Sequence, residues 1–138
     1  MKILIDTNIL VSAALNPQSI PMQAILKSVT SGQIVVCQKN LDELNKTFLK
    51  KFLSRMKDML EFKVFLLARA EIIPTPAKIF SIENSIRDVN DRSILRAAVS
   101  ANVDIIISGD KDFLESGIDK PKILTARDFI DQFVDENN

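Results

Sequence analysis

Short runs of branched aliphatic residues recur along the chain and predict strands that are buried on both faces. They occupy residues 2–5, 34–37, 71–73, 104–107 and 122–124. Apolar residues at helical spacing predict helices between Pro17 and Gly32, from just after Asn40 to residue 52, over 58–70, over 91–101, and from Thr125 onward. Predicted strands and helices therefore alternate along the chain.

This alternation predicts an α/β fold in which a mostly parallel sheet lies between two layers of helices, because parallel neighbours need crossover connections. The chain has 138 residues and no internal repeat or linker. We therefore expect a single domain over residues 1–134, followed by a polar tail at 135–138. Ligands of such sheets bind beyond the carboxyl ends of the strands, so the functional residues are expected at that edge.

The composition narrows the chemistry that the chain can perform. It contains no His, Tyr or Trp, and Cys37 is its single cysteine. Imidazole catalysis, His-ligated metals, intrachain disulfides and thiolate zinc cages are therefore excluded. Cys37 is expected to be a small core residue. No apolar run is long enough to span a bilayer, and we expect a cytoplasmic protein.

The charge balance gives no sign of a large basic surface. Eighteen Lys and Arg residues match eighteen Asp and Glu residues, so the formal net charge is zero. A nucleic-acid partner would have to be held by local groups of basic residues. The candidates are Lys46, Lys50, Lys51, Arg55, Arg87, Arg92 and Arg96, which are equally consistent with ordinary solvated helix surface.

Acidic residues stand at the ends of two predicted strands and at the starts of two predicted helices. Asp6 follows the first strand and Asp110 the fourth, while Glu43 and Asp91 lie in the first turns of helices. Each has an alternative role as a cap, with Glu43 forming a capping box with Asn40. Without histidine, four carboxylates at one edge would repel one another unless a divalent cation lay among them. Oxygen ligands favour Mg²⁺ or Mn²⁺.

Four motifs, in this order and at these spacings, resemble the PIN domain family. They are Ile-Asp-Thr-Asn-Ile-Leu-Val-Ser-Ala at 5–13, Leu-Asp-Glu-Leu at 41–44, Asn-Asp-Arg-Ser-Ile-Leu-Arg-Ala-Ala at 90–98, and Ile-Ile-Ser-Gly-Asp-Lys-Asp-Phe at 106–113. The resemblance covers essentially the whole chain, down to Ile-Leu-Thr-Ala-Arg-Asp-Phe at 123–129. It is closest to small stand-alone PIN proteins that are the toxins of toxin–antitoxin pairs.

The resemblance implies a Rossmann-like α/β/α sandwich with strand order 3-2-1-4-5 and Mg²⁺- or Mn²⁺-dependent cleavage of single-stranded RNA. Asp6, Glu43, Asp91 and Asp110 match the four acids of the family. We expect Asp6 and Asp110 to be direct metal ligands and Asp91 to be a ligand or to contact a water of the metal. Glu43 is expected to be a water-mediated ligand or the general base.

Further residues follow from the same resemblance. Asp112 matches a more variable acidic position and is a candidate for a second metal or for indirect support, while Asn8 and Ser108 match positions that orient the acids. Asp88 could compete with Asp91 or cap its helix. The expected partners are single-stranded RNA, an antitoxin that covers the acidic face, and a second copy of the chain. Phe62, Phe65 and Leu66 would supply the dimer face unless they pack in the core.

Two other functions remain open at this stage. Phosphatases of the haloacid dehalogenase type also place an Asp after the first strand, but Asn8 stands in the place of their second acid and the spacing of Asp110 and Asp112 does not fit their later motif. A non-catalytic PIN-like module that binds RNA or protein is the other alternative.

Overall fold

The computed structural model describes residues 1–133 and contains a five-stranded sheet in which every neighbouring pair of strands is parallel. The strand order is β3-β2-β1-β4-β5, as predicted. The strands are β1 (Lys2–Ile5), β2 (Gln33–Cys37), β3 (Glu71–Ile73), β4 (Ile105–Ile107) and β5 (Lys122–Leu124). The predicted tail at 135–138 lies outside the described residues.

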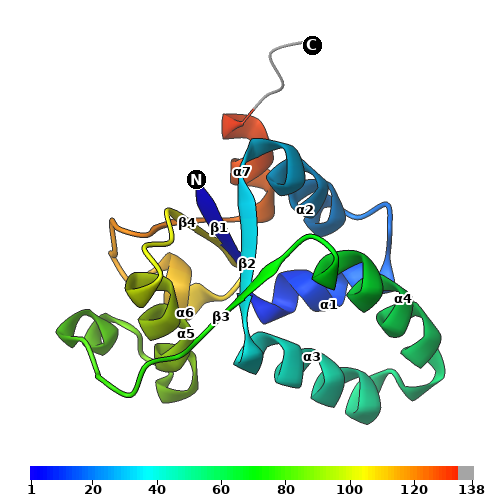
Figure 1. Ribbon diagram of the computed structural model, residues 1–138, viewed down its shortest axis with the longest axis horizontal. Helices are drawn as coiled ribbons and strands as arrows, with labels where there is room; N and C mark the ends of the chain where they lie inside the picture. The colour runs from blue at the N-terminus through cyan, green and yellow to red at the C-terminus, as the bar shows by residue number, and fades with distance from the viewer. Residues whose placement is uncertain (134–138) are drawn as a thin grey trace.

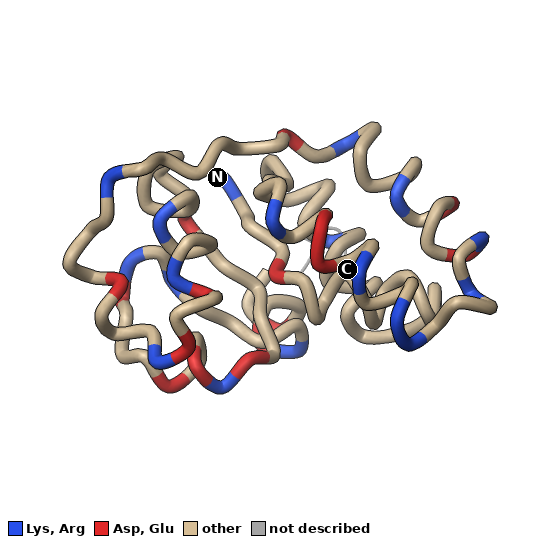
Figure 2. Tube along the Cα trace, turned by 90° about the horizontal axis from the view of Figure 1, so that it is seen from below, with Lys and Arg blue, Asp and Glu red and all other residues tan. Residues whose placement is uncertain are grey.

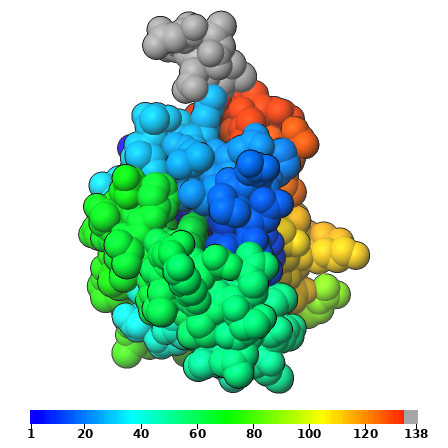
Figure 3. All heavy atoms as spheres, turned by 90° about the vertical axis from the view of Figure 1, so that its right-hand side faces the viewer, coloured from blue at the N-terminus to red at the C-terminus, as the bar shows by residue number. Residues whose placement is uncertain are grey.

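Helices cover both faces of this sheet, so the predicted three-layer sandwich is confirmed (Figure 1). One face carries α1 (Thr7–Leu15), α2 (Ile20–Ser31), α3 (Gln38–Lys51), α4 (Met56–Leu67) and α7 (Ala126–Gln132). The other face carries the 3-10 helix η2 (Ser81–Ser85), α5 (Val89–Ser100) and α6 (Lys111–Leu114). A short 3-10 helix, η1 (Leu53–Arg55), joins α3 to α4, which lies outermost in Figure 3.

Alternating side chains of the central strands build the two cores. Ile3 and Ile5 of β1 pack under α1 and α2, whereas Leu4 points to the opposite layer with Ile94 and Leu95 of α5. This alternation is the period of two that a strand imposes, and burial on both faces explains why these strands are continuously aliphatic. The sheet therefore holds two apolar layers in a fixed relation, and the carboxyl ends of β1 and β4 emerge side by side between them.

Two of the helices that differ from the sequence prediction are α1 and α3. Helix α1 was not predicted, because Val11 and Leu15 are apolar in addition to the buried Ile9, Leu10, Ala13 and Ala14, so its apolar stripe is broad and not sharply one-sided. Helix α3 begins at Gln38 rather than after Asn40, so the placement of Glu43 in its first turn is wrong.

Other predictions concern burial. Cys37 is fully buried, as expected of a small core residue. Phe62 and Leu66 of α4 pack in the core, which is the alternative to a dimer face that the sequence left open. None of the helices within residues 1–133 is long and apolar enough to cross a membrane.

Candidate metal centre

A serine hydroxyl joins the ends of the two central strands. Asp6 follows β1, is the N-cap of α1, and is only 4% exposed. Its Oδ1 accepts a hydrogen bond from the Thr7 amide at 2.8 Å, and its Oδ2 accepts one from Ser108 Oγ at 2.7 Å. Ser108 Oγ in turn accepts from the amide of Asp110 at 3.0 Å. Asp6 and Asp110 therefore lie at one edge of the sheet, and Ser108 orients Asp6 as expected.

A second short network holds Glu43. Thr7 Oγ1 donates to Glu43 Oε2 at 2.7 Å and accepts from Asn40 Nδ2 at 3.0 Å. The Asn40–Glu43 capping box is wrong, because Asn40 Oδ1 instead accepts from the Cys37 amide at 3.1 Å. Asn40 can bond to the Cys37 amide because α3 starts directly after β2. With this start of the helix, the Glu43 side chain lies toward α1. Sequence analysis did not single out Thr7, although it lies within the Asp-Thr-Asn triplet.

Asp91 is the most perturbed acid of the group. Burial and the neighbouring Asp110 carboxyl raise the pKa of Asp91 to about 8, with smaller contributions from Asp6 and Asp88. Burial likewise raises the pKa of Asp6 to about 6, against the hydrogen bonds from Ser108 and Thr7, and the charges of Asp110 and Glu43 raise it further. These effects show that the carboxylates act on one another across the edge of the sheet.

Asp88 and Asp112 border the same group. Asp88 is the N-cap of α5, as the sequence allowed, and accepts from the Asn90 amide at 2.9 Å. One carboxylate oxygen from each of Asp88, Asp91 and Asp112 lies within 4.8 Å of the other two. Asp112 is also paired with Arg87 Nη2 at 2.7 Å. Asp91 is therefore the member of this group on which the carboxyls of Asp110 and Asp6 also act.

The comparisons with known proteins identify the family and the fold of the chain. A family model described as the PIN domain matches residues 2–112, which is most of the chain. The chain belongs to the PIN domain family. None of the curated protein sequences compared with it matches.

Two solved structures share the fold of this PIN domain. VapBC2 from Rickettsia felis, solved bound to a DNA fragment from its promoter, is 21% identical with a TM-score of 0.67, and the match covers 90% of this chain and 97% of that one. FitAcB from Neisseria gonorrhoeae is 18% identical with a TM-score of 0.60, covering 91% and 98%. The likeness therefore extends over nearly the full length of both neighbours.

The acids of this PIN domain fit a divalent cation. Asp91 Oδ2 is buried and has no hydrogen-bond partner among the described residues. A buried, unpaired carboxylate oxygen is costly in water-free surroundings, and a hard cation would satisfy it. Asp6 and Asp110 are the nearest acids on the side of β1 and β4, and all donors in reach are oxygens. Oxygen ligands of this kind suit Mg²⁺ and Mn²⁺.

Several predicted residues have other uses. Asn8 Oδ1 accepts from the Gly109 amide at 3.3 Å, so it holds the loop after β4 rather than an acid. Arg92 Nε donates to the Ile86 carbonyl, and Arg96 pairs with Glu83. Among the remaining candidates for RNA contacts, Arg55 pairs with Asp58 and Arg87 with Asp112, while Lys46, Lys50 and Lys51 are exposed on α3. Figure 2 shows that basic and acidic positions are interspersed along the chain.

We expect the metal-free protein to become more stable as the pH falls from about 8 to about 5. An unfolded Asp has a pKa of about 3.9, whereas Asp91 titrates at about 8 and Asp6 at about 6 in the folded state. The folded state therefore binds more protons across this range, and protonation favours it. Saturating Mg²⁺ would bind the ionised carboxylates, and we therefore expect it to raise the Tm most at the alkaline end.

The measurement is the Tm in EDTA and in Mg²⁺ across that pH range. A Tm in EDTA that is constant or rises with pH would contradict the raised pKa values of Asp6 and Asp91, and with them the close approach of these carboxyl groups.

Proposed function

We propose that this PIN domain is a divalent-metal-dependent endoribonuclease that hydrolyses phosphodiester bonds of single-stranded RNA. The observation that carries the proposal is Asp91, whose buried Oδ2 has no hydrogen-bond partner within residues 1–133 and whose pKa is raised by burial and by the neighbouring carboxyls of Asp110 and Asp6. Membership of the PIN family supports nuclease chemistry. The absence of histidine from the sequence leaves carboxylates as the groups that can accept a proton near neutral pH.

Each acid has a distinct role in this proposal. Asp6 and Asp110 would hold Mg²⁺ or Mn²⁺ directly, and Asp91 would use its unpaired Oδ2 as a ligand or to contact a water of the metal. The bound ion would supply positive charge for the phosphoryl oxygens and lower the pKa of the attacking water. Glu43 Oε2 is occupied by Thr7, so Glu43 Oε1 is the atom proposed to accept the proton. Asp112, which is paired with Arg87, would support the site indirectly.

The proposed partners follow from the structural neighbours. VapBC2 and FitAcB are of the toxin–antitoxin type, which supports an antitoxin that covers the acidic edge and keeps the enzyme silent. We also propose a homodimer. Leu60, Val64 and Leu67 form an exposed apolar stripe along α4 that a second copy could bury. Sedimentation of the purified protein distinguishes monomer from dimer. Inhibition of cleavage by the product of the neighbouring gene tests the antitoxin.

The function is tested with a 5′-labelled single-stranded RNA incubated with the protein in Mg²⁺, Mn²⁺ or EDTA. We expect internal cleavage with either metal and none in EDTA, with duplex RNA and single-stranded DNA as comparison substrates. RNA binding without cleavage in either metal would instead favour the non-catalytic module. Formation of an acyl phosphate trapped by fluoride and Mg²⁺ would favour the phosphatase alternative, which the Asn8–Gly109 hydrogen bond already disfavours.

A further inference from the structure

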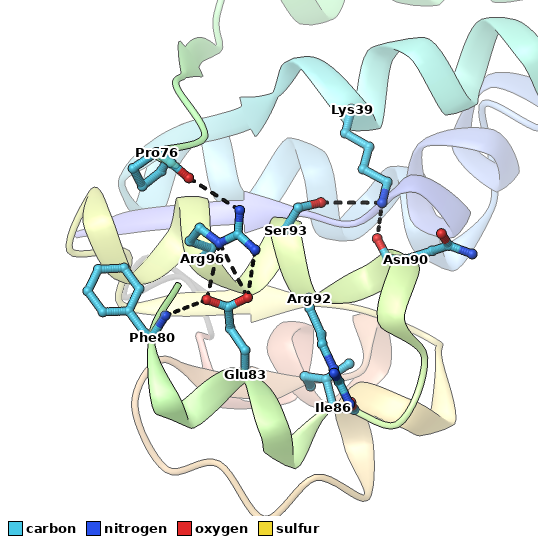
Figure 4. Close-up of polar contacts among 9 residues, drawn as sticks. All are labelled: Lys39, Pro76, Phe80, Glu83, Ile86, Asn90, Arg92, Ser93 and Arg96. Atoms are coloured by element: carbon cyan, nitrogen blue, oxygen red, sulfur yellow. Dashed lines mark hydrogen bonds and ion pairs between the residues drawn. The ribbon is translucent and has the colours of Figure 1, made fainter. Parts of the chain in front are cut away.

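Lys39 connects two helices that lie on opposite faces of the sheet. It is the second residue of α3, one turn before Glu43, and its ammonium group reaches past the edge of the sheet to α5. There Lys39 Nζ donates to the Asn90 carbonyl and to Ser93 Oγ, the latter at 3.3 Å (Figure 4). The same nitrogen lies 4.0 Å from Glu43 Oε1.

This placement runs against the usual preferences of a lysine. A cation in the first turn of a helix is unfavourable because of the helix dipole, and here one ammonium group lies near the first turns of both α3 and α5. An exposed lysine would extend into water, yet the Lys39 side chain is only 32% exposed. The acidic residues nearby, Glu43 above all, offset the unfavourable charge. The Lys39 ammonium group is therefore held on the side of the molecule where Glu43 and the other acidic residues lie.

No other side-chain hydrogen bond joins α3 to α5 within residues 1–133. The remaining contacts of α5 in Figure 4 hold it to its own layer, since Arg96 pairs with Glu83 and Arg92 donates to the Ile86 carbonyl. Those contacts fix α5 against the segment that precedes it, and neither of them reaches α3. Asn90 is the residue directly before Asp91. Lys39 thus connects the backbone beside one proposed metal-site acid to the side chain of another.

We infer that Lys39 is a positioning residue that sets the separation of Glu43 and Asp91 in the proposed metal site. This inference rests on the proposed function, because it assumes that both acids serve one divalent cation. Outer contacts that orient metal ligands typically change metal affinity by about 10-fold to 100-fold when removed. Lys39 touches neither substrate nor metal in this role and acts through Asn90, Ser93 and Glu43.

The test is Mn²⁺ titration by calorimetry without RNA, on the wild type, Lys39→Met and Lys57→Met. Lys57 of α4 also lies 4.0 Å from a glutamate four residues on, Glu61, but its side chain is 89% exposed, and it loses the same charge on substitution. We expect Lys39→Met to bind Mn²⁺ at least about 10-fold more weakly and Lys57→Met to match the wild type. The direction is informative, because losing a positive charge near the site without loss of positioning would tighten cation binding.

Lys39→Arg keeps a charged donor and should bind Mn²⁺ more tightly than Lys39→Met. The Tm of each variant in EDTA shows that it is folded, and Lys39→Arg serves as the test variant if Lys39→Met is not. If Lys39→Met binds Mn²⁺ as tightly as the wild type, or more tightly, the inference about Lys39 is overturned. The proposed function still stands in that case, because the wild-type protein binds Mn²⁺. Failure of the wild type to bind Mn²⁺ would overturn both.

Discussion

Replacing Asp6 with Asn is expected to reduce the proposed metal-dependent RNA cleavage by on the order of 10³-fold, because the substitution would remove a proposed anionic ligand of the cation, worth several kcal/mol in the transition state. Asn has the shape of Asp, but it is neutral and keeps only one oxygen. That oxygen can accept from Ser108 or from the Thr7 amide, but not from both in the present geometry. The variant therefore loses the charge that would hold the cation between β1 and β4.

The same substitution should leave the fold intact or make it more stable. Asp6 is 4% exposed and lies close to the charges of Asp110 and Glu43, which raise its pKa. A neutral side chain removes both the burial cost of the charge and this repulsion. We therefore expect an equal or higher Tm in EDTA together with the loss of cleavage, a combination that global unfolding cannot produce.

The matched control is Asp42→Asn. Asp42 is an exposed acid on α3, next in sequence to Glu43, and its carboxylate accepts only from the Gln38 side chain. This variant should cleave RNA at the wild-type rate under the same Mg²⁺ concentration. Wild-type cleavage by Asp6→Asn, or equal losses in both variants, would remove Asp6 from the metal site.

Replacing Arg96 with Met is expected to lower the free energy of unfolding by about 3–5 kcal/mol. Glu83 is 1% exposed, and Arg96 donates to both of its carboxylate oxygens and to the Pro76 carbonyl. The Glu83 carboxylate also accepts from the Phe80 amide at 2.6 Å. Arg96 holds the pKa of Glu83 below its usual range, so the wild type keeps this charge near neutral pH. Met fills a similar length and leaves that charge buried with no positively charged partner, so the Phe80 amide is its remaining donor.

Urea denaturation at neutral pH measures this loss, with Arg87→Met as the control. Arg87 also pairs with an aspartate, Asp112, but its side chain is 77% exposed, so we expect its removal to lower the free energy of unfolding far less than the removal of Arg96. The double variant Glu83→Met with Arg96→Met should recover part of the stability, because no unpaired charge is then buried. Equal losses in the free energy of unfolding for Arg96→Met and Arg87→Met would show that water reaches the Glu83–Arg96 pair.

The sequence predicted the layers better than the side-chain contacts. The strands were found because burial on both faces leaves an unbroken aliphatic run, as in β1 and β4. Helix α1 was missed because its apolar stripe is broad and includes Val11 and Leu15, so its clearest sequence signal is the Asp6 cap. The start of α3 was misplaced because Asn40 is a residue type that is common at the N-cap. In the structure Asn40 is the third residue of the helix, and its side chain accepts a hydrogen bond from the Cys37 amide.

Part of the candidate site could likewise be predicted from the sequence, and part could not. Asp6 and Asp110 could be placed at one edge from the sequence, because parallel strands end at the same side and both acids directly follow or closely follow a strand. The partner of Glu43 could not, since Thr7 is 36 residues away and only the crossing of α1 and α3 brings the two together. The contact of Lys39 with α5 spans 51 residues and has no local pattern at all.

The amino-acid sequence by itself determined the alternation of strands and helices, the exclusion of histidine chemistry, and the acids that stand near the carboxyl ends of the strands. These are properties of neighbouring residues and of residue types. Only the tertiary structure decided that Asp91 Oδ2 has no partner among residues 1–133, that Ser108 holds Asp6, and that Glu83 is buried against Arg96. Those outcomes depend on how two packed layers meet across the sheet, because that packing determines which side chains from remote segments come within reach of one another.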